Sequence, residues 1–351
     1  LPYLLSEWRN KDKQRGTMLR SQTMTKLVTI FGGSGFVGRY IARRMAQAGW
    51  RVRVAVRRPN AAIFVKPYGT VGQVEPIGCN IRDDASVTAA LSGADAVVNC
   101  VGILNEVGRN KFADVQADGA ARIARLATEH GVSNLVHISA IGADETGPSA
   151  YAVTKAKGEA AIQEHFPNAV ILRPSIIFGS EDQFFNRFAQ MAASLPVLPI
   201  SGANSKFQPV YVDDVARAAV AGAMGQAPAG VYELGGPDVE TFAKLMARMK
   251  SVIQRSPLTL SLPKFVAWCV AFGADMAQAI TFGLFTNSIL TRDQLKQLQT
   301  DNVVADDAKT LSDLGIEATS MASILPDYLW CYRPSGQYAA IKNSAKNLKS
   351  R

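Results

Sequence analysis

Three residues of the sequence, Ser139, Tyr151 and Lys155, have the types and spacing needed for proton transfer. Tyr151 and Lys155 are one helical turn apart, and Ser139 lies twelve residues before Tyr151 at the end of an apolar run. A neighbouring ammonium lowers a phenol's pKa from about 10, so Tyr151 could donate or accept a proton while Ser139 holds a substrate oxygen. We therefore expect a pocket in which Lys155 also holds a nicotinamide ribose and the cofactor carries the hydride. A plain helix-surface pair of Tyr151 and Lys155 is the alternative.

A glycine-rich segment is the candidate for holding that cofactor. It follows an apolar run over 27–31 and precedes a helical pattern over 39–46. Glycines at every third position allow a tight turn, bring backbone N–H groups to a pyrophosphate and let the next helix pack closely. We predict that the whole segment binds a dinucleotide, and a glycine-rich turn without a ligand is the alternative. Its residues are Gly32, Gly33, Ser34, Gly35, Phe36, Val37 and Gly38.

The end of the strand expected over 51–56 indicates which dinucleotide is bound. Arg57 and Arg58 stand there, where chains that bind NAD usually have an acidic residue for the ribose hydroxyls. A carboxylate would repel a 2′-phosphate, whereas a guanidinium can bind it through two parallel hydrogen bonds. The sequence therefore predicts NADP(H) as the cofactor, with Arg57 and Arg58 as phosphate ligands. The alternative is that both arginines are merely solvated at a strand end.

Alternating strand and helix patterns predict an α/β fold that would position these residues. Strands are expected over 27–31, 51–56, 74–77, 96–100, 134–139 and 169–172, and helices over 85–91, 114–130 and 152–166. Apolar strands that alternate with helices predict a doubly wound parallel sheet of the Rossmann type. Ligands of such sheets bind at the carboxyl ends of the strands, so Pro174, just past the last of these strands, is also a predicted cofactor contact.

Changes in composition divide the chain into four expected segments. They are a basic leader over 1–25, the NADP(H)-binding domain over 26–174, a smaller α/β lobe interleaved with it over 175–330, and a basic tail over 331–351. The lobe should include amphipathic, apolar C-terminal helices over 262–285. Their uninterrupted apolar run, 265–274, is too short to cross a bilayer, which takes about twenty residues. It reads either as an interfacial or partner-docked helix or as a buried helix of the lobe.

The net charge of +9 is concentrated at the two ends of the chain. Residues 1–26 carry six Lys or Arg against two acids, and residues 331–351 carry five against none. Basic ends on a neutral body predict docking to something acidic, such as an anionic membrane surface, although solvated ends remain the alternative. We do not expect a nucleic-acid partner, because the ends lack interleaved aromatic residues.

The cysteines and histidines show no spacing typical of a metal site or a disulfide framework, so we predict neither. They are Cys79, Cys100, Cys269 and Cys331, with His130, His137 and His165. A reducing compartment fits this usage best. The first 26 residues have a short apolar start without a small-residue cleavage site, so they are not expected to be a secretory signal.

Over residues 27–235 these motifs resemble the extended or atypical branch of the short-chain dehydrogenase/reductase superfamily. The resemblance rests on the glycine segment and on the Tyr-x-x-x-Lys pair. The resemblance implies that Asn80 and Ile81 flank the adenine, and that the stretch from Asn99, with Cys100, Val101 and Gly102, lies beside the cofactor. The branch includes sugar-nucleotide epimerases, many reductases and members that bind nucleotide without known turnover.

Three further stretches, 172–189, 207–216 and 325–338, are similar to the nucleotide-binding accessory subunits of respiratory complex I, NADH:ubiquinone oxidoreductase. This resemblance spans nearly the whole chain. It implies a tightly held NADPH that stabilises the fold outside the electron path, with other complex I subunits and an anionic membrane surface as partners. It also implies a peripheral location on the cytoplasmic face of a bacterial inner membrane or the matrix side of the mitochondrial one.

Two other functions remain open at this point. One is a free-standing NADPH-dependent reductase or epimerase that uses Ser139, Tyr151 and Lys155; because all three residues are present, the sequence leaves independent turnover undecided. The other is a nucleotide-sensing module related to transcriptional regulators of the superfamily, which the retained Tyr151 and Lys155 make weaker. The C-terminal extension, which a free-standing reductase would not need, favours the accessory subunit.

Overall fold

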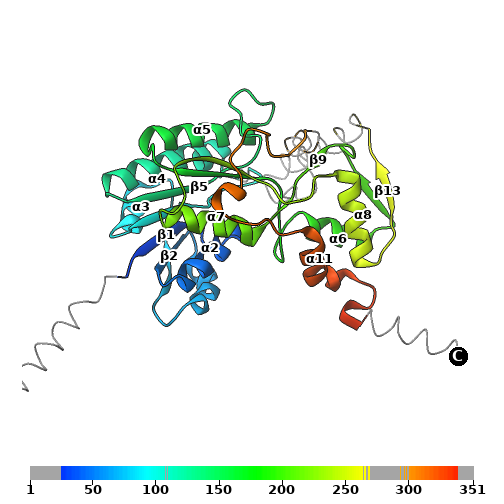
Figure 1. The fold of residues 1–351 in the computed structure, drawn as a ribbon, viewed down its shortest axis with the longest axis horizontal. Helices are drawn as coiled ribbons and strands as arrows, with labels where there is room; N and C mark the ends of the chain where they lie inside the picture. The colour runs from blue at the N-terminus through cyan, green and yellow to red at the C-terminus, as the bar shows by residue number, and fades with distance from the viewer. Residues whose placement is uncertain are drawn as a thin grey trace, which may run out of the picture.

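A seven-stranded parallel sheet forms the larger part of the computed structural model, on the left in Figure 1. The strand order is β11-β6-β5-β4-β1-β2-β3, and every neighbouring pair is parallel. The strands are β1 (Leu27–Phe31), β2 (Arg51–Val56), β3 (Val74–Gly78), β4 (Ala96–Asn99), β5 (Asn134–Ile138), β6 (Val170–Pro174) and β11 (Gly230–Leu234). From β1 the chain builds the sheet outward through β2 to β3, and it then returns to place β4 on the other side of β1. This reversal creates a switch point between β1 and β4, where such folds bind ligands. The predicted doubly wound sheet is confirmed.

The structure describes residues 25–106, 108, 110–263, 265, 268, 293, 296, 298 and 300–338. The predicted basic leader up to residue 24, most of the predicted apolar helices over 262–285 and the tail from residue 339 lie outside these residues. Within the described part of the chain, no helix is both long enough and apolar enough to cross a bilayer.

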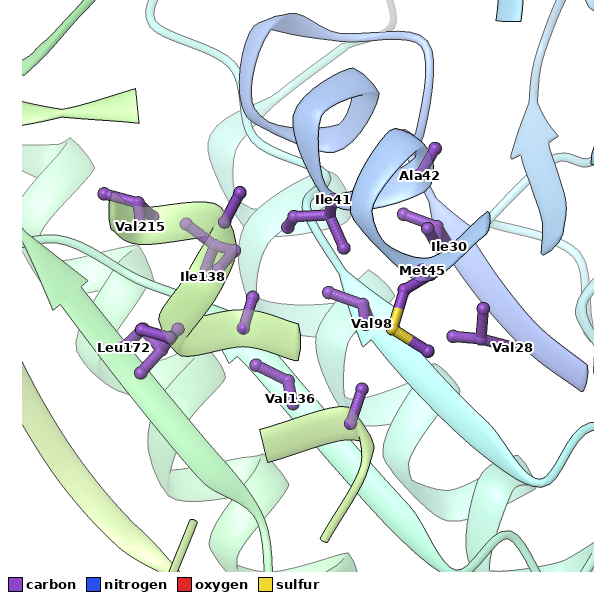
Figure 2. Packing of buried hydrophobic residues seen from close by; sticks show 14 of the residues in the cluster. Val28, Ile30, Ile41, Ala42, Met45, Val98, Val136, Ile138, Leu172 and Val215 are labelled. Atoms are coloured by element: carbon purple, nitrogen blue, oxygen red, sulfur yellow. The ribbon is translucent and has the colours of Figure 1, made fainter. Parts of the chain in front are cut away.

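Helices cover both faces of the sheet, which is why its strands are apolar on both sides. One face carries α2 (Phe36–Gln47) and α7 (Val212–Ala223), and the other carries α3 (Asp84–Leu91), α4 (Asp118–Glu129) and α5 (Ala150–His165). Figure 2 shows the first face, where Met45 of α2 packs near Val28 and Val98 of the sheet. On the second face, strand residues such as Val97 pack against α3, α4 and α5.

A smaller lobe lies beside the sheet (Figure 1). Its helices are α6 (Phe185–Ser194), α8 (Phe242–Ile253) and α11 (Met321–Leu329), and its short strands are β7 (Ile177–Phe178), β8 (Val197–Ile200), β9 (Lys206–Phe207), β10 (Val210–Tyr211), β12 (Glu240–Thr241) and β13 (Leu258–Ser261). Aromatic rings fill its core: Phe184 contacts Phe185 edge-to-face with ring centroids 5.1 Å apart, and Phe207 and Phe242 join them. The lobe therefore has a hydrophobic core of its own.

Four 3₁₀-helices and one π-turn complete the described elements. They are η1 (Pro59–Tyr68), η3 (Ser312–Leu314), η4 (Trp330–Tyr332) and η5 (Gly336–Tyr338), all of 3₁₀ type, and the π-turn η2 (Ala113–Ala117). The helix expected over 114–130 thus begins as a π-turn and continues as α4. Such turns often occur at functional sites.

Two elements that follow residue 174 belong to the large sheet rather than to the lobe. Strand β11 pairs with β6 in parallel register, from Gly230 opposite Val170 to Leu234 opposite Pro174, and α7 packs beside α2. The sequence pattern does not reveal β11, because a five-residue strand with Gly230 and Glu233 has little periodicity. Only the pairing with β6 makes it a strand.

Candidate nucleotide-binding site

The glycine segment forms a tight turn between β1 and α2. Gly32 has a φ of +74°, which a residue with a side chain rarely adopts, and its N–H donates to the carbonyl of Ala55 at 2.9 Å. A Cβ on Gly38 would lie 2.5 Å from the Gly32 oxygen, and one on Gly33 would lie 3.0 Å from Val54 Cγ1. The turn therefore requires glycine where strand and helix approach each other most closely.

The N-terminus of α2 is suited to an anion. The helix begins at Phe36, three residues earlier than expected, so Phe36, Val37 and Gly38 form its first turn. Gly35 occupies the N-cap position, no side chain of the described residues caps the helix there, and the first turn holds no acidic residue. The first backbone N–H groups and the positive end of the helix dipole thus face a ligand position. This is the arrangement that binds the pyrophosphate of a dinucleotide.

Arg39 of α2, which the sequence pattern does not single out, links this turn to the segment between β7 and α6. Its guanidinium donates to the carbonyl of Ser34 at 3.2 Å and pairs with the carboxylate of Glu181 at 3.2 Å. The hydroxyl of Tyr40 donates to the same carboxylate at 3.0 Å. Burial, and then the charge of Glu181, raise the pKa of Tyr40 far above its usual value, so the phenol stays protonated. Glu181 is far from Arg39 in sequence, so no local pattern reveals the pair.

Arg57 and Arg58 lie at the carboxyl end of β2, next to β1 and the glycine turn. Both side chains are exposed. Arg57 donates from Nη1 to Asn110 Oδ1 at 3.1 Å, which places the loop before η2 close to the end of β2. Two adjacent guanidinium groups at this strand end are suited to a 2′-phosphate.

Ile81, predicted to flank the adenine, lies beyond the end of β3 against α4. Its carbonyl accepts a hydrogen bond from Arg122 at 3.0 Å, and its Cδ1 atom would be 2.9 Å from a Cβ on Gly119. Asn80 precedes it and is exposed, with its N–H donating to the Ser86 hydroxyl at 2.9 Å. Contacts with α3 and α4 therefore hold Asn80 and Ile81 in place.

The stretch that follows β4 is held by Asn99. The Oδ1 atom of this buried residue accepts from the N–H of Val101 at 3.1 Å, and its Nδ2 atom donates to His137 Nδ1 on β5 at 3.2 Å. Burial lowers the pKa of His137 well below its usual value, so the imidazole is neutral. Burial also raises the pKa of the Cys100 thiol to about 12, so it is not a nucleophilic thiolate.

Lys155 is a buried cation beside this stretch. Its side chain is 4% exposed, and Nζ donates to the carbonyl of Ile138 at 2.8 Å. A Cβ on Gly102 would lie 3.5 Å from the same nitrogen, so the segment after β4 approaches Lys155 closely. Burial lowers the pKa of Lys155 to about 8, while the charge of Glu159 opposes the shift. The ammonium is thus placed where a ribose hydroxyl could accept from it.

Tyr151 departs from expectation in its electrostatics. Its ring packs edge-to-face on Phe112, with centroids 6.0 Å apart, and burial raises the phenol pKa to about 12. The expectation that Lys155 lowers this pKa is therefore corrected: desolvation dominates at Tyr151, while the Lys155 ammonium is engaged by the Ile138 carbonyl. At neutral pH Tyr151 is therefore a protonated phenol and a weaker acid than a free tyrosine.

Ser139 has a buried hydroxyl without a hydrogen-bond partner among the described residues. It follows β5, whereas Pro174 ends β6, and the carbonyl of Pro174 accepts from the N–H of Ile141 at 3.0 Å. A buried hydroxyl that lacks a partner costs free energy unless a ligand or water satisfies it. Ser139 thus adds a second indication of a ligand beside Lys155.

An ion-pair network that the sequence pattern does not predict supports the helix of Lys155. Arg173 of β6 donates from Nε and Nη2 to the buried carboxylate of Glu159 on α5, at 3.0 Å and 2.6 Å. Its Nη1 atom also lies 3.6 Å from Glu233 of β11. The network ties α5 to two strands and so fixes the position of Lys155 relative to the sheet.

The predicted residues therefore meet along one edge of the sheet, and they fit a dinucleotide. The glycine turn and uncapped α2 can hold the pyrophosphate, Arg57 and Arg58 the ribose phosphate, and Lys155 the other ribose. The nicotinamide would supply hydride chemistry when bound. Within the described residues no group of acidic, histidine and cysteine side chains is arranged to hold a metal ion.

Comparison with known proteins shows which families share this sequence. Residues 28–235 match the model of the NAD dependent epimerase/dehydratase family. The chain is 34% identical to the mitochondrial NADH dehydrogenase (ubiquinone) 1 alpha subcomplex subunit 9 of Arabidopsis thaliana over 329 residues, which cover 92% of this chain and 82% of that protein. It is 31% identical to a ceramide reductase of Caulobacter vibrioides over 240 residues, covering 68% and 74% of the two chains.

A solved structure shows the same fold. The NADPH-dependent quinone oxidoreductase QOR2 of Escherichia coli, complexed with NADPH, superimposes with a TM-score of 0.64 at 19% sequence identity. The match covers 86% of this chain and 98% of that one. At this level of identity the likeness concerns the fold alone.

Proposed function

This chain belongs to the NAD dependent epimerase/dehydratase family, and we propose that within it the chain is an NADPH-binding accessory subunit of respiratory complex I. The observation that carries the proposal is the extent of the similarity. The family model ends at residue 235, yet the similarity to the Arabidopsis subunit covers 92% of the chain. The similarity to the ceramide reductase covers only 68%. The C-terminal part is thus shared with a complex I subunit.

The family and the fold support a bound NAD(P) nucleotide, and the choice of NADPH is the finer proposal. It rests on Arg57 and Arg58, which stand at the end of β2 where an acidic residue would favour NAD. Two exposed guanidinium groups can bind a 2′-phosphate that a carboxylate would repel. We include both arginines among the proposed ligands, with the glycine turn and Lys155.

The bound nucleotide has a structural role in this proposal. A ligand that contacts the ends of β1, β2, β4 and β5 stabilises the folded state by mass action, without any turnover. One feature supports a cofactor that stays unreacted: burial raises the pKa of Tyr151 to about 12, so its phenol is a weak proton donor at neutral pH.

Other complex I subunits are the proposed protein partners, and an anionic membrane surface is the proposed lipid contact. The Arabidopsis relative is named as a subunit of mitochondrial NADH dehydrogenase. The basic residues at the two ends of this chain support attraction to anionic lipid. We propose a peripheral position on the matrix side of the mitochondrial inner membrane, or on the cytoplasmic face of a bacterial one.

Purification of the tagged protein from detergent-solubilised membranes tests this function. The co-purifying polypeptides are identified by mass spectrometry, and the nucleotide released by denaturation is identified and quantified by chromatography. We expect complex I subunits, together with NADPH at close to one per chain. Recovery of an isolated chain with readily exchanged nucleotide would instead support a free-standing reductase, a function that the comparisons do not favour.

A further inference from the structure

A segment of the C-terminal part runs from the end of β6 to the side of β11, the terminal strand of the sheet. We call residues 300–309 the strap. Its Asn302 forms a parallel bridge with Phe207, and its Lys309 forms one with Tyr232 of β11. Glu233 donates its N–H to the Lys309 carbonyl at 2.8 Å. The strap lies outside residues 28–235, which the family model matches.

Asn302 ties the strap to the ends of two strands. Its Oδ1 atom accepts from the hydroxyl of Ser175, directly after β6, at 2.6 Å, and its Nδ2 atom donates to the carbonyl of Ile141 at 3.4 Å. Its backbone is held as well, by Lys206 and Gln208 at 2.8 Å and 3.1 Å. Asn302 is thus bonded on both its side chain and its backbone.

The chain just before the strap is attached to the first turn of α5. The carboxylate of Asp293 accepts from the hydroxyl of Ser149 at 2.8 Å and from the N–H of Ala150 at 2.9 Å. The Lys296 ammonium donates to the carbonyl of Pro148 at 2.8 Å. A carboxylate at a helix N-terminus is stabilised by the exposed N–H groups and the helix dipole. This first turn is the one that carries Tyr151.

The contacts of Asn302 lie just beyond the ends of β5 and β6, and those of Asp293 lie at the start of α5. Substrates of such sheets approach from the carboxyl ends of the strands, here the ends of β5 and β6. Ser139, with its unpartnered hydroxyl, lies two residues before Ile141, whose carbonyl Asn302 engages. Asn302 and Asp293 therefore flank the proton-transfer residues from two directions.

We propose that the strap, held by Asn302, excludes a second substrate from the reactive end of the bound nucleotide. Asn302 is then a specificity-determining residue: the protein binds its dinucleotide but admits no large carbonyl or quinone acceptor. This inference rests on the proposed nucleotide-binding function. It also explains how Ser139, Tyr151 and Lys155 can all be present in a subunit whose nucleotide stays unreacted.

Quenching of bound NADPH fluorescence by acrylamide tests the strap in the full-length protein. Asn302→Ala removes the side-chain bonds to Ser175 and Ile141 and leaves the backbone of the strap unchanged. The matched control is Asn204→Ala, at an exposed asparagine of the same lobe. We expect a severalfold larger quenching constant for Asn302→Ala than for wild type, and no change for Asn204→Ala.

Binding of NADPH is measured first by titration, so that two failures can be told apart. If wild type does not bind NADPH, the proposed nucleotide function is wrong. If all variants bind it and quenching is equal, the strap does not shield the nucleotide and the inference is overturned. Should Asn302→Ala fail to fold, Ser175→Ala removes the 2.6 Å bond from the opposite side and is judged by the same comparison.

Discussion

The hydroxyl of Tyr328 donates a 2.5 Å hydrogen bond to the buried carboxylate of Asp182, across 146 residues of sequence. Asp182 also accepts from the N–H groups of Gly179, Phe184 and Asn186. Burial raises the pKa of Asp182, and these hydrogen bonds oppose the shift. The preceding residue, Glu181, contacts Arg39 and Tyr40 beside the glycine turn. One turn of the chain thus contacts both the proposed pyrophosphate site and the C-terminal helix α11.

Replacing Tyr328 with phenylalanine should destabilise the protein. The ring can stay packed, but the buried Asp182 carboxylate loses one of its donors. A buried polar group that loses a partner costs about 1–3 kcal/mol, and we expect a loss of that size in urea unfolding. Tyr338→Phe, at a side chain that is 61% exposed, is the matched control and should leave stability unchanged. Equal stability of both variants would mean that the hydrogen bond contributes nothing.

Charge reversal at the end of β2 should discriminate between the two nicotinamide dinucleotides. The double variant Arg57→Glu with Arg58→Glu removes the proposed 2′-phosphate ligands and adds repulsion. Each lost charged hydrogen bond is worth about 1.5–3 kcal/mol, so NADPH affinity should fall at least about tenfold. NADH affinity should change much less in the same calorimetric titration.

The control for this prediction is Arg51→Glu, an exposed arginine at the opposite end of the same strand. It alters the net charge without touching the proposed site, so it should preserve the preference for NADPH. Equal weakening of NADPH and NADH by the double variant would rule out Arg57 and Arg58 as phosphate ligands.

An added methyl group at Gly38 should disturb the nucleotide turn. The Cβ of Gly38→Ala would lie 2.5 Å from the Gly32 oxygen, so backbone has to move. Overpacking of this kind costs about 1–3 kcal/mol, and the moved turn should also bind nucleotide more weakly. Gly78→Ala is the control, because its Cβ would have its nearest atom 4.0 Å away. The melting temperature and the NADPH affinity of both variants are measured by thermal unfolding and by titration. Equal values for Gly38→Ala and Gly78→Ala would contradict the prediction.

The buried Lys155 should give stability a distinctive pH dependence. Its folded-state pKa of about 8 lies below the ordinary lysine value of 10.5, because burial disfavours the ammonium. Between these values the unfolded chain binds more protons than the folded protein, so the contribution of Lys155 to stability rises with pH. Relative to Lys155→Met, wild type should gain up to about 3 kcal/mol between about pH 7 and about pH 10.

Urea unfolding at a series of pH values measures this difference. Lys157→Met, at an exposed position of the same helix, serves as the control and should follow the wild-type curve. Parallel curves for wild type and Lys155→Met would show that the ammonium is not buried as the structure has it.

The local parts of the site are predictable because their signals lie within a few residues. The apolar run over 27–31, the glycines after it and the helix that follows form a continuous pattern, and β1 and α2 confirm it. The same holds for strands β2 to β6 and for helices α3, α4 and α5, whereas η1 was not predicted. The start of α2 at Phe36 differs from expectation because Gly35 already ends the turn.

Electrostatics were less predictable, because a pKa depends on burial and on neighbours distant in sequence. The spacing of Tyr151 and Lys155 suggests an activated phenol, yet desolvation raises the pKa of Tyr151 to about 12. Spacing along a helix tells which side chains are adjacent and not how much solvent each retains.

The parallel sheet, the glycine turn and the paired arginines at the end of β2 are all predictable from the chain, because periodicity and residue type are local properties. Folding is needed to bring Arg39 to Glu181, Tyr328 to Asp182 and Asn302 to Ser175. Each of these pairs joins residues more than a hundred positions apart. Such contacts depend on how whole elements pack, and a polar residue in a loop carries no sign of the partner that packing brings to it.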